Sequence, residues 1–227
     1  MIVIPEKVAY IKVPKAASTT IARLFWERHG VNQNSRLNPD VATTVRHFMP
    51  IDEVGPQIPI LNGNWFYNRS GAFGWHAGYD DLMHVFGDQL ADFHWVASVR
   101  HPVARLFSVF SFQVAKQRIN ATLSANDFDR FCQQVFDGRH GMSQQQVVHT
   151  WSQCRWLPPE GAACSIIRQE SLADDLNRLS NRVKTFGDAN LSSTNRSFKG
   201  AWQDYVSSDL AAKIEMFYSD DMERLNY

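Results

Sequence analysis

The chain carries three groups of side chains that could bind an anionic group and act on it. Lys15 lies directly before the small and hydroxyl-bearing residues 16–20. Ser108 follows Arg100 by eight positions, and His76 lies between these two cationic segments. Lysine, arginine and hydroxyl groups bind phosphate-like anions, and an imidazole can accept a proton near neutral pH. These residue types indicate a site for a phosphate-like anion, with a histidine as a candidate base.

The segment around Lys15 has the pattern of a strand, a tight loop and a helix. Residues 8–13 are mostly apolar and rich in β-branched and aromatic types, which predicts a short buried strand. Ser18 or Thr19 can cap the helix that follows. The N–H groups at the start of this helix, the Lys15 charge and the nearby hydroxyls could together bind a phosphate group. The glycine-rich Walker pattern is missing, so an ordinary strand–helix turn with a surface lysine is the alternative.

A second strand and helix surround Arg100. Residues 93–99 predict a buried strand, and residues 103–117 predict a helix with one apolar side. On its opposite side lie polar residues, so Ser108 and Arg100 could face a shared crevice. The alternative is that this polar side only meets solvent.

His76 lies between Gly74 and Gly78, a spacing that predicts a turn before a helix over residues 79–86. The turn would leave the imidazole at the end of a strand or loop, where it could act as a base. A lone histidine of this kind is more often a surface residue or a hydrogen-bonded core residue.

A third buried strand is predicted over residues 163–168. Three buried strands separated by helices imply an α/β fold with a central parallel sheet flanked by helices. The length of 227 residues and the absence of a linker suggest one domain over residues 1–227. Residues 31–64 are interrupted by prolines and predict an irregular segment with one short strand near residues 43–48.

Residues 119–165 are predicted to be largely helical, and a further helix with Leu172, Leu176 and Leu179 on one face is expected after the third strand. Asn126 or Asp127 is expected to begin one helix, and a glutamine-rich turn is expected at residues 143–146. The last helix is expected over residues 208–218. Before it, residues 190–200 form a polar loop.

The composition excludes several classes of protein. Lys and Arg together equal Asp and Glu, at 23 each, so no overall charge attracts nucleic acid or a membrane. No apolar run is long enough to span a membrane, and the first strand begins too close to Met1 for a signal peptide, which predicts a cytoplasmic protein. Cys132, Cys154 and Cys164 lack C-x-x-C spacing and suggest reduced core thiols. The histidines lack metal-ligand spacing, so no metal site is predicted.

Two of these segments resemble those of a known family. Residues 12–20 (KVPKAASTT) resemble the 5′-phosphosulfate loop of the carbohydrate-type sulfotransferases, and residues 99–108 (VRHPVARLFS) resemble their 3′-phosphate motif. Residues 75–77, 167–172 and 217–222 are weaker likenesses in the same order along the chain. The nearest likeness is to the Golgi enzymes that sulfate heparan and chondroitin and to their bacterial relatives. From the sequence we expect this chain to differ from the Golgi enzymes in having no membrane anchor or stem, and in being shorter over residues 31–64 and 119–165, where acceptor contacts would lie.

The resemblance implies a three-layer fold of the P-loop type. It also implies transfer of a sulfuryl group from 3′-phosphoadenosine 5′-phosphosulfate (PAPS) to a hydroxyl group of a carbohydrate-type or small-molecule acceptor. The resemblance further implies that Lys15 would stabilise the leaving group and that His76 would be the general base. The PAPS-binding residues would be Lys15, Ala16, Ala17, Ser18, Thr19, Thr20, Arg100, Ser108, Arg196 and Lys199. The reserve candidates for the base are Glu53, Asp80 and Asp81.

Two other functions remain open on the residues alone. A kinase or nucleotide hydrolase with a degenerate P-loop would need Mg²⁺, which such enzymes hold with an aspartate at a strand end. Here the corresponding strand runs into Arg100. The other possibility is a nucleotide-binding protein that has kept the anion site without catalysis.

Overall fold

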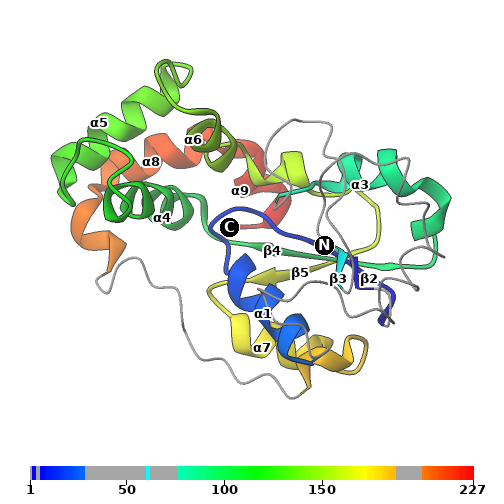
Figure 1. Cartoon of the computed structure of the whole chain (residues 1–227). Coiled ribbons are helices and arrows are strands. Elements are labelled where there is room, and N and C mark those ends of the chain that lie inside the picture. The colour runs from blue at the N-terminus through cyan, green and yellow to red at the C-terminus, as the bar shows by residue number, and fades with distance from the viewer. Residues whose placement is uncertain (1, 4–5, 29–59, 62–75, 188–200) are drawn as a thin grey trace. The chain divides into compact units, whose positions relative to one another are not determined.

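The computed structural model describes residues 2–3, 6–28, 60–61, 76–187 and 201–227 (Figure 1). The chain divides into two compact units. The first unit comprises residues 1–99 and 156–192, and the second comprises residues 100–155 and 193–227. The single domain expected over residues 1–227 stays a prediction.

The first unit contains a five-stranded sheet in the order β3-β1-β2-β4-β5. Its strands are β1 (Ile2–Val3), β2 (Val8–Ile11), β3 (Ile60–Leu61), β4 (His94–Val99) and β5 (Cys164–Arg168). The parallel pairing of β2, β4 and β5 confirms the three strands predicted from the sequence. The two short strands were not predicted: β1 pairs antiparallel with β2 and parallel with β3. The strand expected near residues 43–48 lies outside the described residues.

Helices cover both faces of this sheet. On one face lie α1 (Ser18–Arg28), α7 (Leu172–Leu179) and the short 3₁₀ helix η5 (Lys184–Phe186), and their apolar side chains form one core cluster with Val96 of β4. On the other face lies α3 (Tyr79–Phe86), where the Tyr79 ring packs 4.8 Å from the ring of Trp95. Successive residues of a strand point to opposite faces, so Trp95 and Val96 identify the two sides. The predicted three-layer α/β fold with a central parallel sheet flanked by helices is confirmed (Figure 1).

The local signals that delimit α3 act as expected. The helix covers residues 79–86, as predicted, and Gly87 follows it with φ of 48°. The positive φ favours glycine, and with ψ of −127° the backbone leaves the helical conformation at this residue. The 3₁₀ helix η3 (Gly87–Leu90) then leads toward β4.

The second unit is built from helices. Its helices are α4 (Pro102–Ala115), α5 (Ala125–Phe136), α6 (Gln144–His149), α8 (Ser208–Phe217), α9 (Ser219–Leu225) and the 3₁₀ helix η6 (Trp202–Tyr205). The 3₁₀ helix η4 (Gln153–Trp156) begins in this unit, and its last residue, Trp156, belongs to the first unit. The apolar side of α4 lies in a core cluster together with residues of α5 and α8, as its periodicity predicted. That core fixes α4, the helix that follows Arg100.

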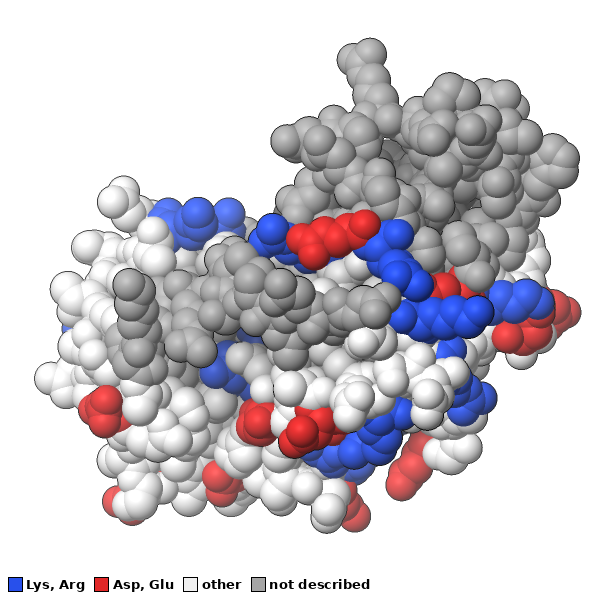
Figure 2. Space-filling model, turned by 90° about the horizontal axis from the view of Figure 1, so that it is seen from below, with Lys and Arg blue, Asp and Glu red and all other residues white. Residues whose placement is uncertain are grey.

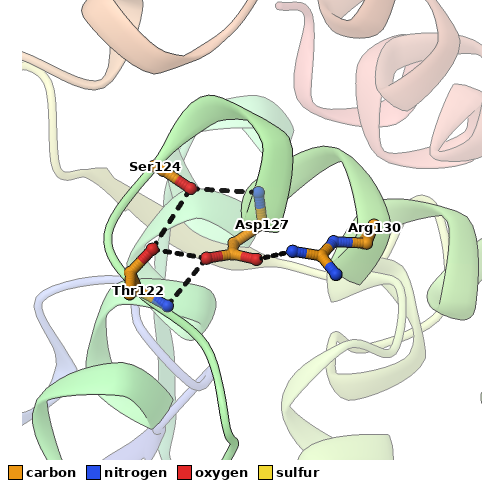
Figure 3. Close-up of polar contacts among 4 residues, drawn as sticks. All are labelled: Thr122, Ser124, Asp127 and Arg130. Carbon is orange, nitrogen blue, oxygen red and sulfur yellow. Dashed lines mark hydrogen bonds and ion pairs between the residues drawn. The ribbon is translucent and has the colours of Figure 1, made fainter.

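The start of α5 differs from the prediction. Ser124, rather than Asn126 or Asp127, precedes the helix, and its hydroxyl accepts a hydrogen bond from the N–H of Asp127 at 3.2 Å (Figure 3). The Asp127 carboxylate in turn accepts hydrogen bonds from the N–H and hydroxyl of Thr122 and forms an ion pair with Arg130. These contacts, led by the Thr122 hydroxyl, lower the pKa of Asp127 to about 2. Asp127 is therefore ionised at neutral pH and holds the loop before α5 in place.

Two further helices were not predicted. The turn expected at residues 143–146 is the beginning of α6, because Ser143 and Gln146 form a capping box that stabilises a helix start. The last predicted helix ends at Phe217 and is followed at once by α9. The hydroxyl of Ser207 accepts a hydrogen bond from Leu210 and caps α8.

The charged side chains agree with the balanced composition. Seen from the side on which Figure 1 draws α1 and α7, basic and acidic side chains lie next to one another (Figure 2). Arg23 pairs with Glu27 on α1, and Arg178 pairs with Asp175 on α7.

None of the described helices has the length and apolar character that a membrane span requires. The three cysteines form no disulfide, but only Cys132 is fully buried, so the expectation of three core thiols is wrong for Cys154 and Cys164.

Candidate functional site

The loop between β2 and α1, residues 12–17, is called the Lys15 loop below. Its backbone alternates in handedness, because Lys15 has φ of 65° and Ala17 has φ of 57°, whereas Ala16 between them is not left-handed. A non-glycine residue in the left-handed region costs roughly 1–2 kcal/mol. Such strain gathers at functional sites, and alternating handedness is the backbone pattern of anion-binding nests. The conformation of the Lys15 loop therefore favours binding of an anion.

The first turn of α1 adds N–H groups to the Lys15 loop. The helix begins at Ser18 itself, and its first bond runs from the N–H of Ile21 to the carbonyl of Ala17 at 3.1 Å. The sequence suggested that Ser18 or Thr19 precedes the helix and caps it, but Ser18 is the first helical residue. The N–H groups of a first turn have no carbonyl partner within the helix and carry the positive end of its dipole. With no acidic residue in this turn, the potential there favours an anion.

His76 lies against the Lys15 loop although it is 64 positions from Lys12 in the chain. Its Nδ1 lies 2.8 Å from the carbonyl oxygen of Lys12. Because a carbonyl can only accept, Nδ1 carries the proton and Nε2 is the basic nitrogen of the neutral ring. Burial, with smaller contributions from the charges of Lys12 and Lys15, lowers the pKa of His76 to about 4. The imidazole is therefore uncharged at neutral pH and in the form that a general base requires.

The turn that carries His76 is itself well supported. The His76 ring lies 6.1 Å from the ring of Trp156, which is buried in the first unit. A side chain at Gly78 would come within 3.3 Å of the Trp156 backbone, so only glycine fits there without a shift. The N–H of Gly78 donates to the Asp81 carboxylate at 2.9 Å, which fixes the start of α3. Asp81 therefore caps a helix, and Asp80 is exposed.

Lys12 is a member of the site that the sequence analysis did not assign. Its side chain is only 4% exposed, and burial lowers its pKa to about 8. Lys12 is the one polar residue of the strand predicted over residues 8–13, and its residue type does not indicate that its side chain is buried. The structure thus places a second lysine, beside Lys15, close enough to His76 to affect its pKa.

Arg100 and Ser108 belong to the second unit. Arg100 follows the last residue of β4, and both of its backbone polar groups bind the side chain of Gln153. Ser108 is half-buried on α4, and its carbonyl accepts a hydrogen bond from the Ser111 hydroxyl at 3.3 Å. Gln153 was not found from the sequence because only the fold brings it next to Arg100.

The side of α4 opposite its apolar stripe carries a buried arginine. Arg105 on that side is fully buried and donates to the backbone carbonyls of His149, at 3.1 Å, and Trp151. Arg105 therefore holds the segment after α6 and is not available at the surface. The predicted residues Arg196, Lys199 and Glu53 lie outside the described residues.

The strained conformation of the Lys15 loop gives a prediction about stability. Ala17→Val should lower the free energy of unfolding by about 1–2 kcal/mol, because a β-branched side chain tolerates positive φ poorly. Ala17→Gly should be the more stable of the two variants, since glycine adopts this conformation freely. Urea unfolding measures both, with Thr19→Val, an exposed change on α1, as the control. A valine variant as stable as the glycine variant would contradict the assigned backbone conformation.

Comparison with known proteins identifies the family of the chain. A family model described as a sulfotransferase family matches residues 2–227. The comparisons with curated proteins and with solved structures gave no match. Because the matched range covers nearly the whole chain, including the Lys15 loop, His76 and Arg100, the chain belongs to the sulfotransferase family, which includes carbohydrate sulfotransferases.

Proposed function

We propose that this sulfotransferase moves a sulfuryl group from PAPS to a hydroxyl group of a carbohydrate-type acceptor. The observation that carries the proposal is the hydrogen bond from His76 Nδ1 to the carbonyl of Lys12. It joins a neutral imidazole to a loop whose backbone and charge suit an anion. Membership of the family supports sulfuryl transfer as the reaction. The donor, the acceptor class and the residue roles are the proposal.

The Lys15 loop and the first turn of α1 would bind the 5′-phosphosulfate of the donor. The N–H groups and hydroxyls of residues 16–20 would contact its oxygens, and the helix dipole would favour its charge. PAPS supplies an activated sulfuryl group whose bridging oxygen gains negative charge as the bond to sulfur breaks. Lys15 would neutralise that charge, a contribution worth roughly 10²–10³ in rate for a preorganised donor.

His76 would remove the proton from the acceptor hydroxyl. The Lys12 carbonyl fixes the ring tautomer, so Nε2 is the nitrogen that accepts the proton. A positioned base of this kind contributes roughly 10²–10⁴ in rate. Because its lowered pKa keeps His76 neutral, the ring would be ready to accept a proton throughout the neutral range.

Arg100 and Ser108 would bind the 3′-phosphate and so select PAPS over nucleotides without that group. A guanidinium binds a phosphate through two parallel hydrogen bonds, and a serine hydroxyl adds a third donor. Arg196 and Lys199 would close over the nucleotide from the late polar loop. Among the described residues, no three His, Cys, Asp or Glu side chains come together.

The proposed role of Arg100 gives a selective prediction. Arg100→Ala should weaken binding of adenosine 3′,5′-bisphosphate roughly tenfold to a hundredfold, the loss expected for a hydrogen bond between charged groups. Binding of adenosine 5′-phosphosulfate should stay nearly unchanged, because that ligand has no 3′-phosphate. Calorimetry measures both, and Arg155→Ala, an exposed arginine of the same unit, is the matched control. Equal losses for the two ligands would give Arg100 a general structural role.

The experiment that tests the function follows radiolabelled sulfate from PAPS to a panel of acceptors. We expect label on one or more polysaccharides or glycosides, and none with boiled protein. Label that reaches only peptides or lipid headgroups would show that the acceptor class is wrong and leave sulfuryl transfer intact. No transfer from PAPS, together with phosphate transfer from ATP, would overturn the proposal.

A further inference from the structure

Gln153 binds the backbone of Arg100 with both ends of its side chain. The N–H of Arg100 donates to Gln153 Oε1 at 2.9 Å, and Gln153 Nε2 donates to the carbonyl of Arg100 at 2.8 Å. Only one orientation of the amide satisfies both bonds, since the N–H needs an acceptor and the carbonyl needs a donor. Gln153 is fully buried, so water does not compete for these contacts. The two bonds together fix both the position and the direction of the chain at Arg100.

Asp221, in the first turn of α9, fixes Gln153 in turn. Its carboxylate accepts hydrogen bonds from the N–H of Gln153 at 2.9 Å and from Gln153 Nε2 at 3.4 Å. It also accepts from the hydroxyl of Ser152 at 2.6 Å and the N–H of Cys154 at 2.9 Å. Asp221 is fully buried, and its lone pairs are occupied by these donors. The carboxylate therefore holds residues 152–154 as one rigid segment beside Arg100.

The contact between Gln153 and Arg100 lies where the β4–β5 ladder ends, and this position affects how the Arg100 side chain could bind a ligand. The parallel ladder between β4 and β5 ends at Val99 and Arg168, so Arg100 is the first residue beyond the sheet. Gln153 supplies a donor and an acceptor of the kind that a neighbouring strand would supply. An arginine side chain is long and flexible, and a guanidinium must meet a phosphate in a narrow geometry to form two hydrogen bonds. Fixing its backbone reduces the freedom that binding must remove.

We propose that Gln153 and Asp221 are positioning residues for Arg100, which hold its backbone so that the guanidinium meets the 3′-phosphate of the donor. The inference rests on the proposed function, because it takes the 3′-phosphate as the ligand of Arg100. Neither residue touches the donor in this account. The network acts through Arg100 alone, so it affects ligands with a 3′-phosphate and leaves others unaffected.

The test compares two ligands that differ at the 3′ position. In Gln153→Met, a change of similar length that removes both hydrogen bonds, we expect affinity for adenosine 3′,5′-bisphosphate to fall roughly tenfold to a hundredfold, the scale of an ångström-sized misplacement. Affinity for adenosine 5′-phosphosulfate should stay within about twofold. Val135→Ala is the control, because it opens the buried core of the same unit and its apolar side chain takes no part in the hydrogen bonds of Gln153 and Asp221. This variant should lower the melting temperature and leave the ratio of the two affinities unchanged.

A double variant shows whether Gln153 affects binding of the 3′-phosphate through Arg100 or independently of it. If Gln153 acts through Arg100, then Arg100→Ala combined with Gln153→Met should bind adenosine 3′,5′-bisphosphate no more weakly than Arg100→Ala alone. Additive losses would overturn the inference. Asp221→Asn removes the charge that orients Gln153 and should shift the affinity ratio in the same direction as Gln153→Met, so it decides the question if the methionine variant does not fold.

The remaining outcomes are distinct. Equal loss of affinity for both ligands in the Gln153 and Asp221 variants would show that the network only supports the fold. Selective loss in Arg100→Ala, with an unchanged ratio in both network variants, would refute positioning and leave the proposed function standing. No binding of adenosine 3′,5′-bisphosphate by the unaltered protein would refute the proposed function itself.

Discussion

His76→Asn should lower turnover by roughly 10²–10⁴ while leaving affinity for adenosine 3′,5′-bisphosphate largely unchanged. Asparagine can still donate a hydrogen bond toward the Lys12 carbonyl, but it has no basic nitrogen to take the acceptor proton. The loss would therefore fall on the chemical step. Steady-state kinetics with PAPS and an active acceptor measure it, and His84→Asn, an exposed histidine on α3, is the matched control.

The pH profile tests the same assignment independently. A histidine base acts only when it is neutral, so activity falls as pH drops through its pKa. For an ordinary histidine this loss would centre near pH 6.5, but the lowered pKa of His76 moves it to about pH 4. We expect kcat/KM to stay level from pH 7.5 down to about 5.5. Nearly normal turnover in His76→Asn would place the base elsewhere, with Asp80 and Glu53 next to be tested.

Lys15→Ala should lower kcat by roughly 10²–10³, with a much smaller loss of affinity for adenosine 3′,5′-bisphosphate. The charge of Lys15 matters most when the bridging oxygen becomes negative, which happens in the transition state and not in the bound ground state. Comparing kcat with the KM for PAPS separates the two effects. A higher KM with unchanged kcat would make Lys15 a binding residue only.

Lys7→Ala is a close control for this experiment. Lys7 lies in the same unit and also has positive φ, at 49°, so a change to alanine has a similar backbone effect at both positions. Its side chain is exposed and pairs with Asp92 on the surface. Lys7→Ala should leave kcat unchanged, which would show that the loss in Lys15→Ala comes from the lost charge at the loop.

The elements that the sequence predicted correctly are those with strong local signals. The buried runs that become β2, β4 and β5 need no knowledge of their neighbours, because apolar, β-branched residues bounded by turns favour strands. The same holds for α3 and its terminal Gly87. The start of α6 differs from the prediction, because Ser143 followed by a run of glutamines is compatible with a turn as well as with the capping box that Ser143 and Gln146 form.

The contacts that define the candidate site could not be predicted in this way. The bond between His76 and Lys12 joins residues 64 positions apart, and the bonds from Gln153 reach Arg100 across 53 positions and Asp221 across 68. No local pattern marks such pairs. The resemblance to the family suggested His76 and Arg100 as site residues. The lowered pKa of His76 and the burial of Lys12 follow only from the packed structure.

Calorimetric titration with adenosine 3′,5′-bisphosphate in the presence of EDTA is the most direct test of the account. The Lys15 loop and the Arg100 segment would bind the two phosphates of this ligand, and neither interaction requires a metal ion. We predict one site per chain, with affinity at least tenfold higher than for adenosine 5′-monophosphate, since the extra hydrogen bonds to a charged phosphate are worth about 1.5–3 kcal/mol. Tighter binding of MgATP than of adenosine 3′,5′-bisphosphate, or no binding of the bisphosphate, would contradict the account.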